Sequence, residues 1–136
     1  MKRFVSLWLP VIFWMSLIFS LSSVPDLQSG LKQEVDIILR KLAHIGEYAV
    51  LTFLLARALS RYSLKTSSQR LLLLSFLLSL LYAVSDEVHQ RFIPGREGAL
   101  RDIAIDSIGI TLALLLLASK NRVAKTLATY LRIKDV

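Results

Sequence analysis

The stretch Tyr82–Gly109, YAVSDEVHQRFIPGREGALRDIAIDSIG, places a polar, charged segment between two strongly apolar runs. It contains five acids, one histidine and three arginines. Within it, Ile93-Pro94-Gly95-Arg96 predicts a turn, because proline fixes one central φ angle and glycine permits the positive φ of a type II turn. We therefore expect two apolar helices joined at a polar bend.

The rest of the chain is too apolar for an ordinary soluble domain. Its hydrophobic content is 54% and its mean hydropathy is +0.57, whereas soluble domains contain about 45 to 50% apolar residues. Runs of about 20 apolar residues are long enough to cross a bilayer as helices. Four such runs predict membrane-spanning helices over residues 4–21, 42–59, 71–90 and 100–117. We predict an all-α, integral membrane four-helix bundle, with residues 1–136 forming a single domain.

Four segments in this prediction depend on further observations. The first run is longer than the apolar part of a signal peptide, so we expect a retained helix. The third apolar run must continue to Gln90 to span the membrane, which draws Asp86, Glu87 and His89 into the outer part of the bilayer. Residues 26–36 are polar and predict a loop. Residues 123–133 alternate apolar and basic faces and predict an amphipathic helix on the membrane surface.

Charge distribution predicts the orientation of the helices. Of the 17 lysines and arginines, 11 fall on the side that holds both termini, together with only one of the ten acids. Because basic residues favour the cytoplasmic side, we expect both termini in the cytoplasm. The net charge of +7 then reflects membrane topology, and we expect no nucleic-acid partner. Since the chain has no cysteine, disulfides, thiol catalysis and thiolate metal sites are excluded.

Polar residues interrupt three helices at the same predicted depth. His44, Asp86 and Asp102 each lie 15 residues from the cytoplasmic end of their run, which corresponds to about 22 Å along a helix. Charged groups at such depth cost a few kcal/mol on insertion scales, so we expect them to face the bundle interior and one another. This predicts a polar pocket that opens to the outside above an apolar floor.

Helical spacing assigns further residues to the same faces, because positions three, four and seven apart lie together. The predicted faces are Lys41, His44 and Tyr48 on the second helix, with Glu47 beside them; Tyr82, Asp86, His89 and Gln90 on the third, with Glu87 beside them; and Asp102, Asp106, Gly109 and Ala113 on the fourth. Gly109 and Ala113 also form a pair of small residues that permits close approach of another helix.

These motifs resemble the VanZ-like membrane family. The residues that carry the resemblance are Lys41-x-x-His44-x-x-Glu47-Tyr48, then Asp86-Glu87-x-His89-Gln90-x-Phe92-x-Pro94-Gly95-Arg96, then Asp102 and Gly109, within residues 22–118. The resemblance implies a small bacterial envelope protein, related to proteins associated with teicoplanin resistance. Asp106 stands where the family usually has asparagine, and Thr52 and Ala113 stand where glycine is common.

The candidate site residues divide by chemistry. A histidine and a carboxylate can move a proton, whereas basic and polar side chains can hold an anion. The candidate catalytic residues are His44, Glu47, Asp86, Glu87 and His89, and the candidate substrate-binding residues are Lys41, Tyr48, Gln90, Arg96, Asp102 and Asp106. We expect a multi-pass protein of the bacterial cytoplasmic membrane whose motif face is extracytoplasmic. Its expected partners are membrane lipid and a lipid-linked cell-wall precursor or a glycopeptide.

Two alternatives remain open from the residues alone. In the first, the cluster is a structural ion-pair network in which Lys41, Arg96 and Arg101 neutralise Asp86, Glu87, Asp102 and Asp106. In the second, the protein is a metal-dependent membrane hydrolase with His44, His89, Asp86 and Glu87 around a divalent ion. No cofactor is predicted, and the sequence contains no nucleotide-binding loop or nucleophile elbow. Whether the protein is an enzyme is left open.

Overall fold

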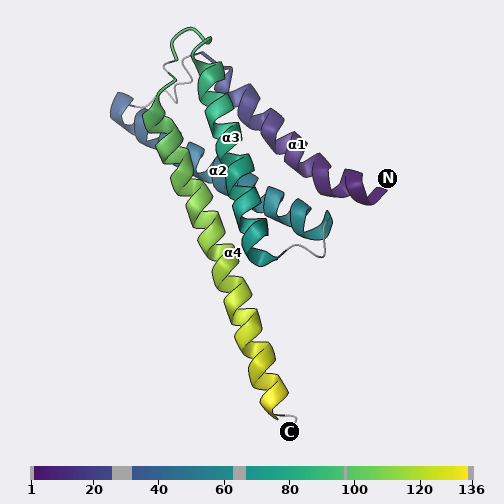
Figure 1. Ribbon diagram of the computed structural model, residues 1–136. Helices are drawn as coiled ribbons and strands as arrows, with labels where there is room; N and C mark the ends of the chain where they lie inside the picture. Colours follow the sequence, from purple (N-terminus) through teal and green to yellow (C-terminus); the bar gives the residue numbers. More distant parts are fainter. Residues whose placement is uncertain (1, 26–31, 63–66, 97, 135–136) are drawn as a thin grey trace.

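Four helices form along the apolar runs of the chain. The computed structural model describes residues 2–25, 32–62, 67–96 and 98–134, and these residues contain α1 (Lys2–Ser22), α2 (Gln33–Tyr62), α3 (Ser68–Gln90) and α4 (Leu100–Lys134). In Figure 1, α1 and α3 end, and α4 begins, toward the same end of the bundle. We call this the pocket end. Helix α2 packs against all three other helices.

All four helices are long and apolar enough to cross a membrane. The candidate spans are Phe4–Ser22, Glu34–Arg61, Ser68–Gln90 and Leu100–Lys120. Only 11 to 33% of the most apolar window in each span is buried within the molecule, so most of this apolar surface faces outward. An apolar surface of that extent is typical of a membrane-embedded protein. The all-α prediction with four spanning helices is confirmed.

Helix α2 begins earlier than the sequence predicted. Residues 33–36 were expected to belong to a loop, and the span was expected to begin at residue 42, yet the helix begins at Gln33. Its first turn contains Glu34 and Asp36, and negative charges there interact favourably with the positive end of the helix dipole. The apolar run therefore located the buried part of the helix and missed its polar first turns.

The predicted bend between α3 and α4 is confirmed. The Arg96 backbone N–H donates to the Ile93 carbonyl oxygen at 3.1 Å, and Gly95 has a φ of 78°, as a type II turn requires. Helix α4 continues without interruption to Lys134, and its far end extends beyond the other helices in Figure 1. Residues 123–133, expected as a separate surface helix, are thus a continuation of α4, while their position at a membrane surface remains a prediction.

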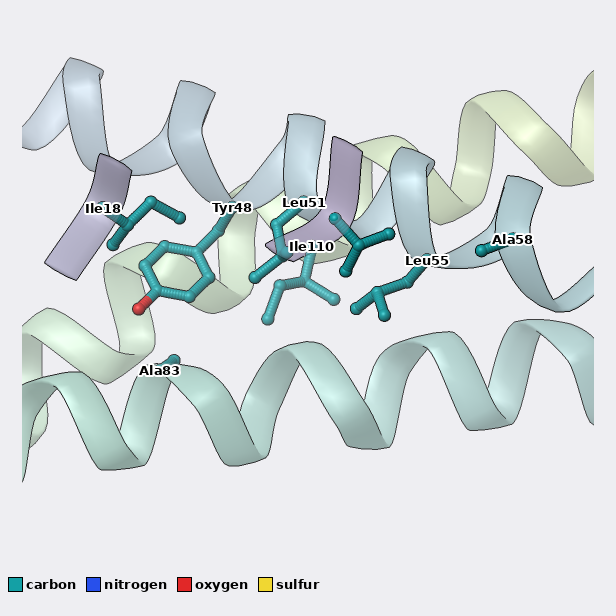
Figure 2. Packing of buried hydrophobic residues seen from close by; sticks show 8 residues of the cluster. Ile18, Tyr48, Leu51, Leu55, Ala58, Ala83 and Ile110 are labelled. Atoms are coloured by element: carbon teal, nitrogen blue, oxygen red, sulfur yellow. The ribbon is translucent and has the colours of Figure 1, made fainter. Parts of the chain in front are cut away.

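The apolar core lies between α2 and its three neighbours. Figure 2 shows Tyr48 and Leu51 of α2 directed between Ile18 of α1, Ala83 of α3 and Ile110 of α4. Two side-chain hydrogen bonds connect α1 to this core: Trp14 Nε1 donates to the Glu47 carbonyl oxygen at 2.9 Å, and the Tyr82 hydroxyl donates to the Met15 carbonyl oxygen at 2.6 Å. Helix α1 is thereby fixed against both α2 and α3.

Close approach of α2 and α4 depends on Gly109. A Cβ atom at this position would overlap the Ile45 carbonyl oxygen and lie 2.9 Å from the Ile45 carbonyl carbon. Ala113, one turn further along α4, is also buried. The two small residues allow the helix backbones to touch. Gly109 thereby holds the first turns of α4 against the middle of α2, where His44 and Tyr48 lie.

Candidate functional site

A cavity of about 260 Å³ opens at the pocket end, between the first half of α2, the end of α3, the α3–α4 bend and the start of α4. Among the described residues, its walls carry four basic side chains and one acidic side chain. The lining residues are Ile37, Arg40, Lys41, His44, Gln90, Gly95, Arg96, Arg101, Asp102 and Ile105. The cavity is therefore a cationic site with two isoleucines in its wall.

His44 connects this cavity to a buried carboxylate. Its Nδ1 lies 3.1 Å from Asp106 Oδ1, and the His44 side chain is 14% exposed, whereas the Asp106 side chain is fully buried. A buried carboxylate beside one ring nitrogen fixes the orientation of the imidazole and favours a proton on that nitrogen. Nε2 is then the ring nitrogen that remains for a group in the cavity. The pair joins α2 to α4. The equal-depth argument matched His44 with Asp102, whereas the observed partner is Asp106, one helical turn further along α4.

Asp86 is bound within the protein rather than exposed in the cavity. Its Oδ2 accepts hydrogen bonds from the Ser22 hydroxyl at 2.8 Å and from Gln90 Nε2 at 2.9 Å. All three residues are buried. Gln90 also lines the cavity, so Asp86 orients the amide of a wall residue and connects the end of α1 to α3.

Glu87 contacts the beginning of α4. Its Oε2 accepts the backbone N–H of Ala99 at 2.9 Å, directly before the first residue of that helix. A carboxylate at a helix N-terminus satisfies an unpaired N–H group and interacts favourably with the helix dipole. Gly98 allows this contact, because a Cβ atom there would overlap the Glu87 carbonyl oxygen. Glu87 therefore has a structural partner and does not line the cavity.

His89 also lies outside the cavity lining. Its Nε2 is 2.9 Å from the Ser23 hydroxyl, and its ring stacks on Phe19 with centroids 4.3 Å apart. Both partners come from the end of α1 and the residue after it. The interaction fixes the end of α1 against α3, on different partners from those of His44.

Arg96 forms part of the cavity wall and also holds the end of α1. Its Nη2 donates to the carbonyl oxygens of Leu21 and Val24, each at 3.1 Å, and its Nε donates to Val24 at 3.3 Å. These carbonyls lie where α1 ends, and the Leu21 carbonyl oxygen also accepts the Val24 backbone N–H at 3.3 Å. Burial, and then the nearby Arg40 guanidinium, lower the pKa of Arg96. Asp86, Glu87 and Glu47 act on this pKa in the opposite direction.

Lys41 and Asp102 line the cavity from α2 and α4, and Arg101 pairs with Asp102 at 3.7 Å. Tyr48 is fully buried in the core, and Glu47 lies on α2 outside the lining. Of the 11 residues proposed from the sequence, five line the cavity: Lys41, His44, Gln90, Arg96 and Asp102. Asp86 and Asp106 bind lining residues through their side chains, whereas the side chains of Glu47, Tyr48, Glu87 and His89 make no hydrogen bond with a lining residue in the described part of the chain.

The sequence interpretation missed Arg40 as a wall residue. Arg40 lies one helical turn before His44, so the spacing that selected Lys41 and Tyr48 would have selected it as well. Arg101, considered only as an ion-pair partner, and the isoleucines Ile37 and Ile105 were also missed as lining residues.

The proposed ion-pair network forms only in part. Arg101 pairs with Asp102, but within the described part of the chain neither Lys41 nor Arg96 makes an ion pair with a carboxylate. Four buried oxygen atoms have no hydrogen-bond partner among the described residues. They are Tyr48 Oη, Asp86 Oδ1, Glu87 Oε1 and Asp106 Oδ2. Carboxylates of the cluster are thus bound chiefly by hydroxyl, amide and imidazole groups.

A metal centre has little geometric support. The described residues contain no group of three or more histidine or acidic side chains arranged to hold an ion. His44 and His89 contact Asp106 and Ser23 respectively, so their observed partners differ. The ligand set considered from the sequence, His44, His89, Asp86 and Glu87, is not brought together.

Comparison with known proteins identifies the chain at the level of its family. No curated protein and no solved structure matches it. A family model described as VanZ/LLP1 matches residues 7–121. That range contains all four candidate spans except the first residues of α1, together with every residue of the cavity. The chain belongs to the VanZ/LLP1 family.

Proposed function

We propose that this membrane protein binds the anionic headgroup of a membrane lipid, or of a lipid-linked envelope component, in the cavity at its pocket end. The observation that carries the proposal is the charge of the wall, where Arg40, Lys41, Arg96 and Arg101 line the cavity and Asp102 is the one acid among the described lining residues. Charge-assisted hydrogen bonds from arginine and lysine are the usual means of holding phosphate or carboxylate groups.

The position of the cavity supports a lipid rather than a soluble anion. It lies at the ends of the candidate spans, since Gln90 ends one span and Arg101 and Asp102 begin another. A lipid whose tail stays in the bilayer can therefore place its headgroup there. The distribution of lysine and arginine supports a cytoplasmic location for both termini and an external location for the pocket end.

Size restricts the ligand. A cavity of about 260 Å³ is smaller than the roughly 300 to 1,000 Å³ of pockets for drug-sized molecules. A headgroup fits this scale, whereas a glycopeptide antibiotic does not. We therefore propose that any contribution to teicoplanin resistance proceeds through the lipid component of the envelope, and not through enclosure of the antibiotic in this cavity.

Binding is favoured over metal-dependent hydrolysis. Among the five residues considered for catalysis, His44 alone lines the cavity, while Asp86, Glu87 and His89 have partners within the fold. The ion-pair alternative is disfavoured for a similar reason, because Lys41 is half-buried in the cavity wall without a carboxylate partner among the described residues.

Removal of two wall cations tests the proposal. The double variant Lys41→Gln, Arg101→Gln should lose affinity for phosphatidylglycerol by about 100-fold. Each hydrogen bond to a charged group contributes about 1.5 kcal/mol or more, and a loss of 1.4 kcal/mol lowers the affinity tenfold, so the loss of two such bonds lowers it by about two factors of ten. Binding is measured on purified protein by native mass spectrometry, with phosphatidylcholine as the zwitterionic comparison. The matched control is Lys32→Gln, Arg57→Gln, which removes two exposed cations that do not line the cavity.

Two results would contradict the proposal. In the first, the control variant loses as much affinity as the cavity variant, so that the protein's net charge and not the cavity governs binding. In the second, phosphatidylcholine binds as tightly as phosphatidylglycerol. The same two variants, expressed at equal levels in a teicoplanin-sensitive bacterium, also test the resistance role. We expect the control to retain any protection that the unmodified protein gives, and the cavity variant to lose it.

A further inference from the structure

The His44 side chain lies at the boundary between two groups of opposite charge. On the cavity side are Arg40 and Lys41 of α2, Arg96 of the bend and Arg101 of α4. On the buried side, Asp106 of α4 contacts the ring directly, and Glu47 of α2 and Asp86 of α3 also act on it electrostatically. Asp102 of α4 is the acid in the cavity wall, and Glu87 of α3 lies further away at the start of α4. Cations oppose a positive charge on the imidazole, whereas the acids favour it.

An anion in the cavity changes this balance. With Nδ1 held by Asp106 at 3.1 Å, an imidazole that takes a proton on Nε2 gains a second N–H donor directed away from the carboxylate. A bound anion would neutralise the surrounding cations and accept that new donor. Because coupling between two binding events is reciprocal, a ligand that favours protonation is itself bound more tightly by the protonated protein.

We propose that anion binding in this cavity is coupled to the uptake of one proton by His44, with Asp106 as the positioning residue that holds the ring. The inference rests on the proposed headgroup-binding function and adds its regulation. The proton comes from solvent and bonds to Nε2 of His44. The Nδ1–H of the same ring continues to donate its hydrogen bond to Asp106. No bond of the ligand forms or breaks, so the coupling requires no further reactant.

Isothermal titration calorimetry of the full-length protein measures this uptake directly. Two probes that do not titrate between pH 5 and 8 are used, short-chain dihexanoyl phosphatidylglycerol and inorganic sulfate, each in buffers of different ionisation enthalpy. The dependence of the heat on the buffer gives the number of protons taken up. We expect up to one proton per bound anion and an affinity that rises by up to tenfold for each unit of pH decrease. A lipid-specific site binds the first probe and not sulfate, whereas a general anion site binds both.

Two variants separate proton coupling from a purely structural role. His44→Gln retains an amide donor toward the cavity and should bind with no proton uptake and no pH dependence. Asp106→Asn retains an acceptor for Nδ1–H but lacks the negative charge, so its affinity should begin to rise at a lower pH than that of the unmodified protein. A loss of affinity by the same factor at every pH in Asp106→Asn would show that Asp106 only maintains the fold.

The experiment distinguishes failure of this inference from failure of the proposed function. If neither probe binds the unmodified protein, headgroup binding itself fails and the coupling with it. If a probe binds and Lys41→Gln weakens it, but binding proceeds without proton uptake or His44→Gln retains the full pH dependence, only the coupling is overturned.

Discussion

Substitution of Gly109 by alanine should separate α2 from α4 and disturb the cavity together with the fold. The added Cβ would overlap the Ile45 carbonyl oxygen and lie 2.9 Å from the carbonyl carbon and 3.1 Å from the Cα atom of the same residue. All three are backbone atoms, so no side chain can rotate to make room. Overpacking of a well-packed interior costs about 1 to 3 kcal/mol, and we expect a loss within this range for a single methyl group.

The same displacement should weaken the contact between His44 and Asp106. His44 is the residue before Ile45, and Asp106 lies about one turn before Gly109, so the Nδ1 to Oδ1 distance of 3.1 Å spans the two backbones that must move apart. The variant should therefore lose binding of an anionic probe as well as stability.

Gly46→Ala supplies a matched control. A Cβ at Gly46 has no heavy atom within 4 Å among the described neighbours, and alanine is preferred over glycine inside a helix by about 1 kcal/mol. Unfolding in mixed micelles with increasing fractions of a denaturing detergent gives the free energy of unfolding for both variants. Gly46→Ala should be as stable as the original or more stable. If Gly109→Ala unfolds at the same detergent fraction as Gly46→Ala, the close helix approach inferred at Ile45 is wrong.

Three further substitutions test other parts of the structure. Tyr48→Phe should leave the free energy of unfolding unchanged or raise it by about 1 kcal/mol, because the Tyr48 hydroxyl is buried without a partner among the described residues and such a group carries a desolvation penalty; a large loss in detergent unfolding would contradict this. Ser22→Ala should lower the free energy of unfolding by about 1 kcal/mol or more, since it leaves Asp86 with one hydrogen bond fewer. An unchanged free energy of unfolding would refute that contact. For topology, Phe92→Cys and Ser68→Cys each introduce a single thiol at an exposed position, at opposite ends of α3. A membrane-impermeant maleimide applied to intact cells should label the Phe92→Cys variant and not the Ser68→Cys variant. The reverse labelling pattern would show that the predicted orientation is inverted.

The sequence predicted the number and type of the helices because membrane insertion imposes a simple rule on apolar length. It was less accurate about where they end. Helix α2 begins at Gln33, before the start of its apolar run, and α4 continues to Lys134, beyond the end of its apolar run. Backbone hydrogen bonding continues a helix through polar residues wherever the flanking chain allows it, whereas hydropathy detects only the part suited to hydrocarbon.

The meeting of His44 with the acidic face of α4 was predictable in outline, because polar groups in a membrane bundle should face its interior. Equal depth matched His44 with Asp102, however, and the observed partner is Asp106, one turn further along the same face. The partners of the remaining cluster were not. Ser22 and Ser23 bind Asp86 and His89, and the backbone at the end of α1 binds Arg96. Hydroxyl and carbonyl groups at a helix end carry no periodic signal, and their positions depend on how α1 packs against α3. The sequence therefore predicted a site built from α2, α3 and α4, whereas the structure shows that α1 supports it as well.

At the pocket end, the acidic and the basic side chains have different kinds of partner, and α1 contributes to this difference. Asp86, Glu87 and Asp106 are buried and each has a partner within the protein: the Ser22 hydroxyl with the Gln90 amide, the N–H before α4, and the His44 ring. None of these partners is a lysine or arginine. The acids consequently do not neutralise the cavity wall at close range, and Lys41 and Arg96 make no ion pair with a carboxylate in the described part of the chain. This separation of charge supports the proposal that the cavity binds an anion.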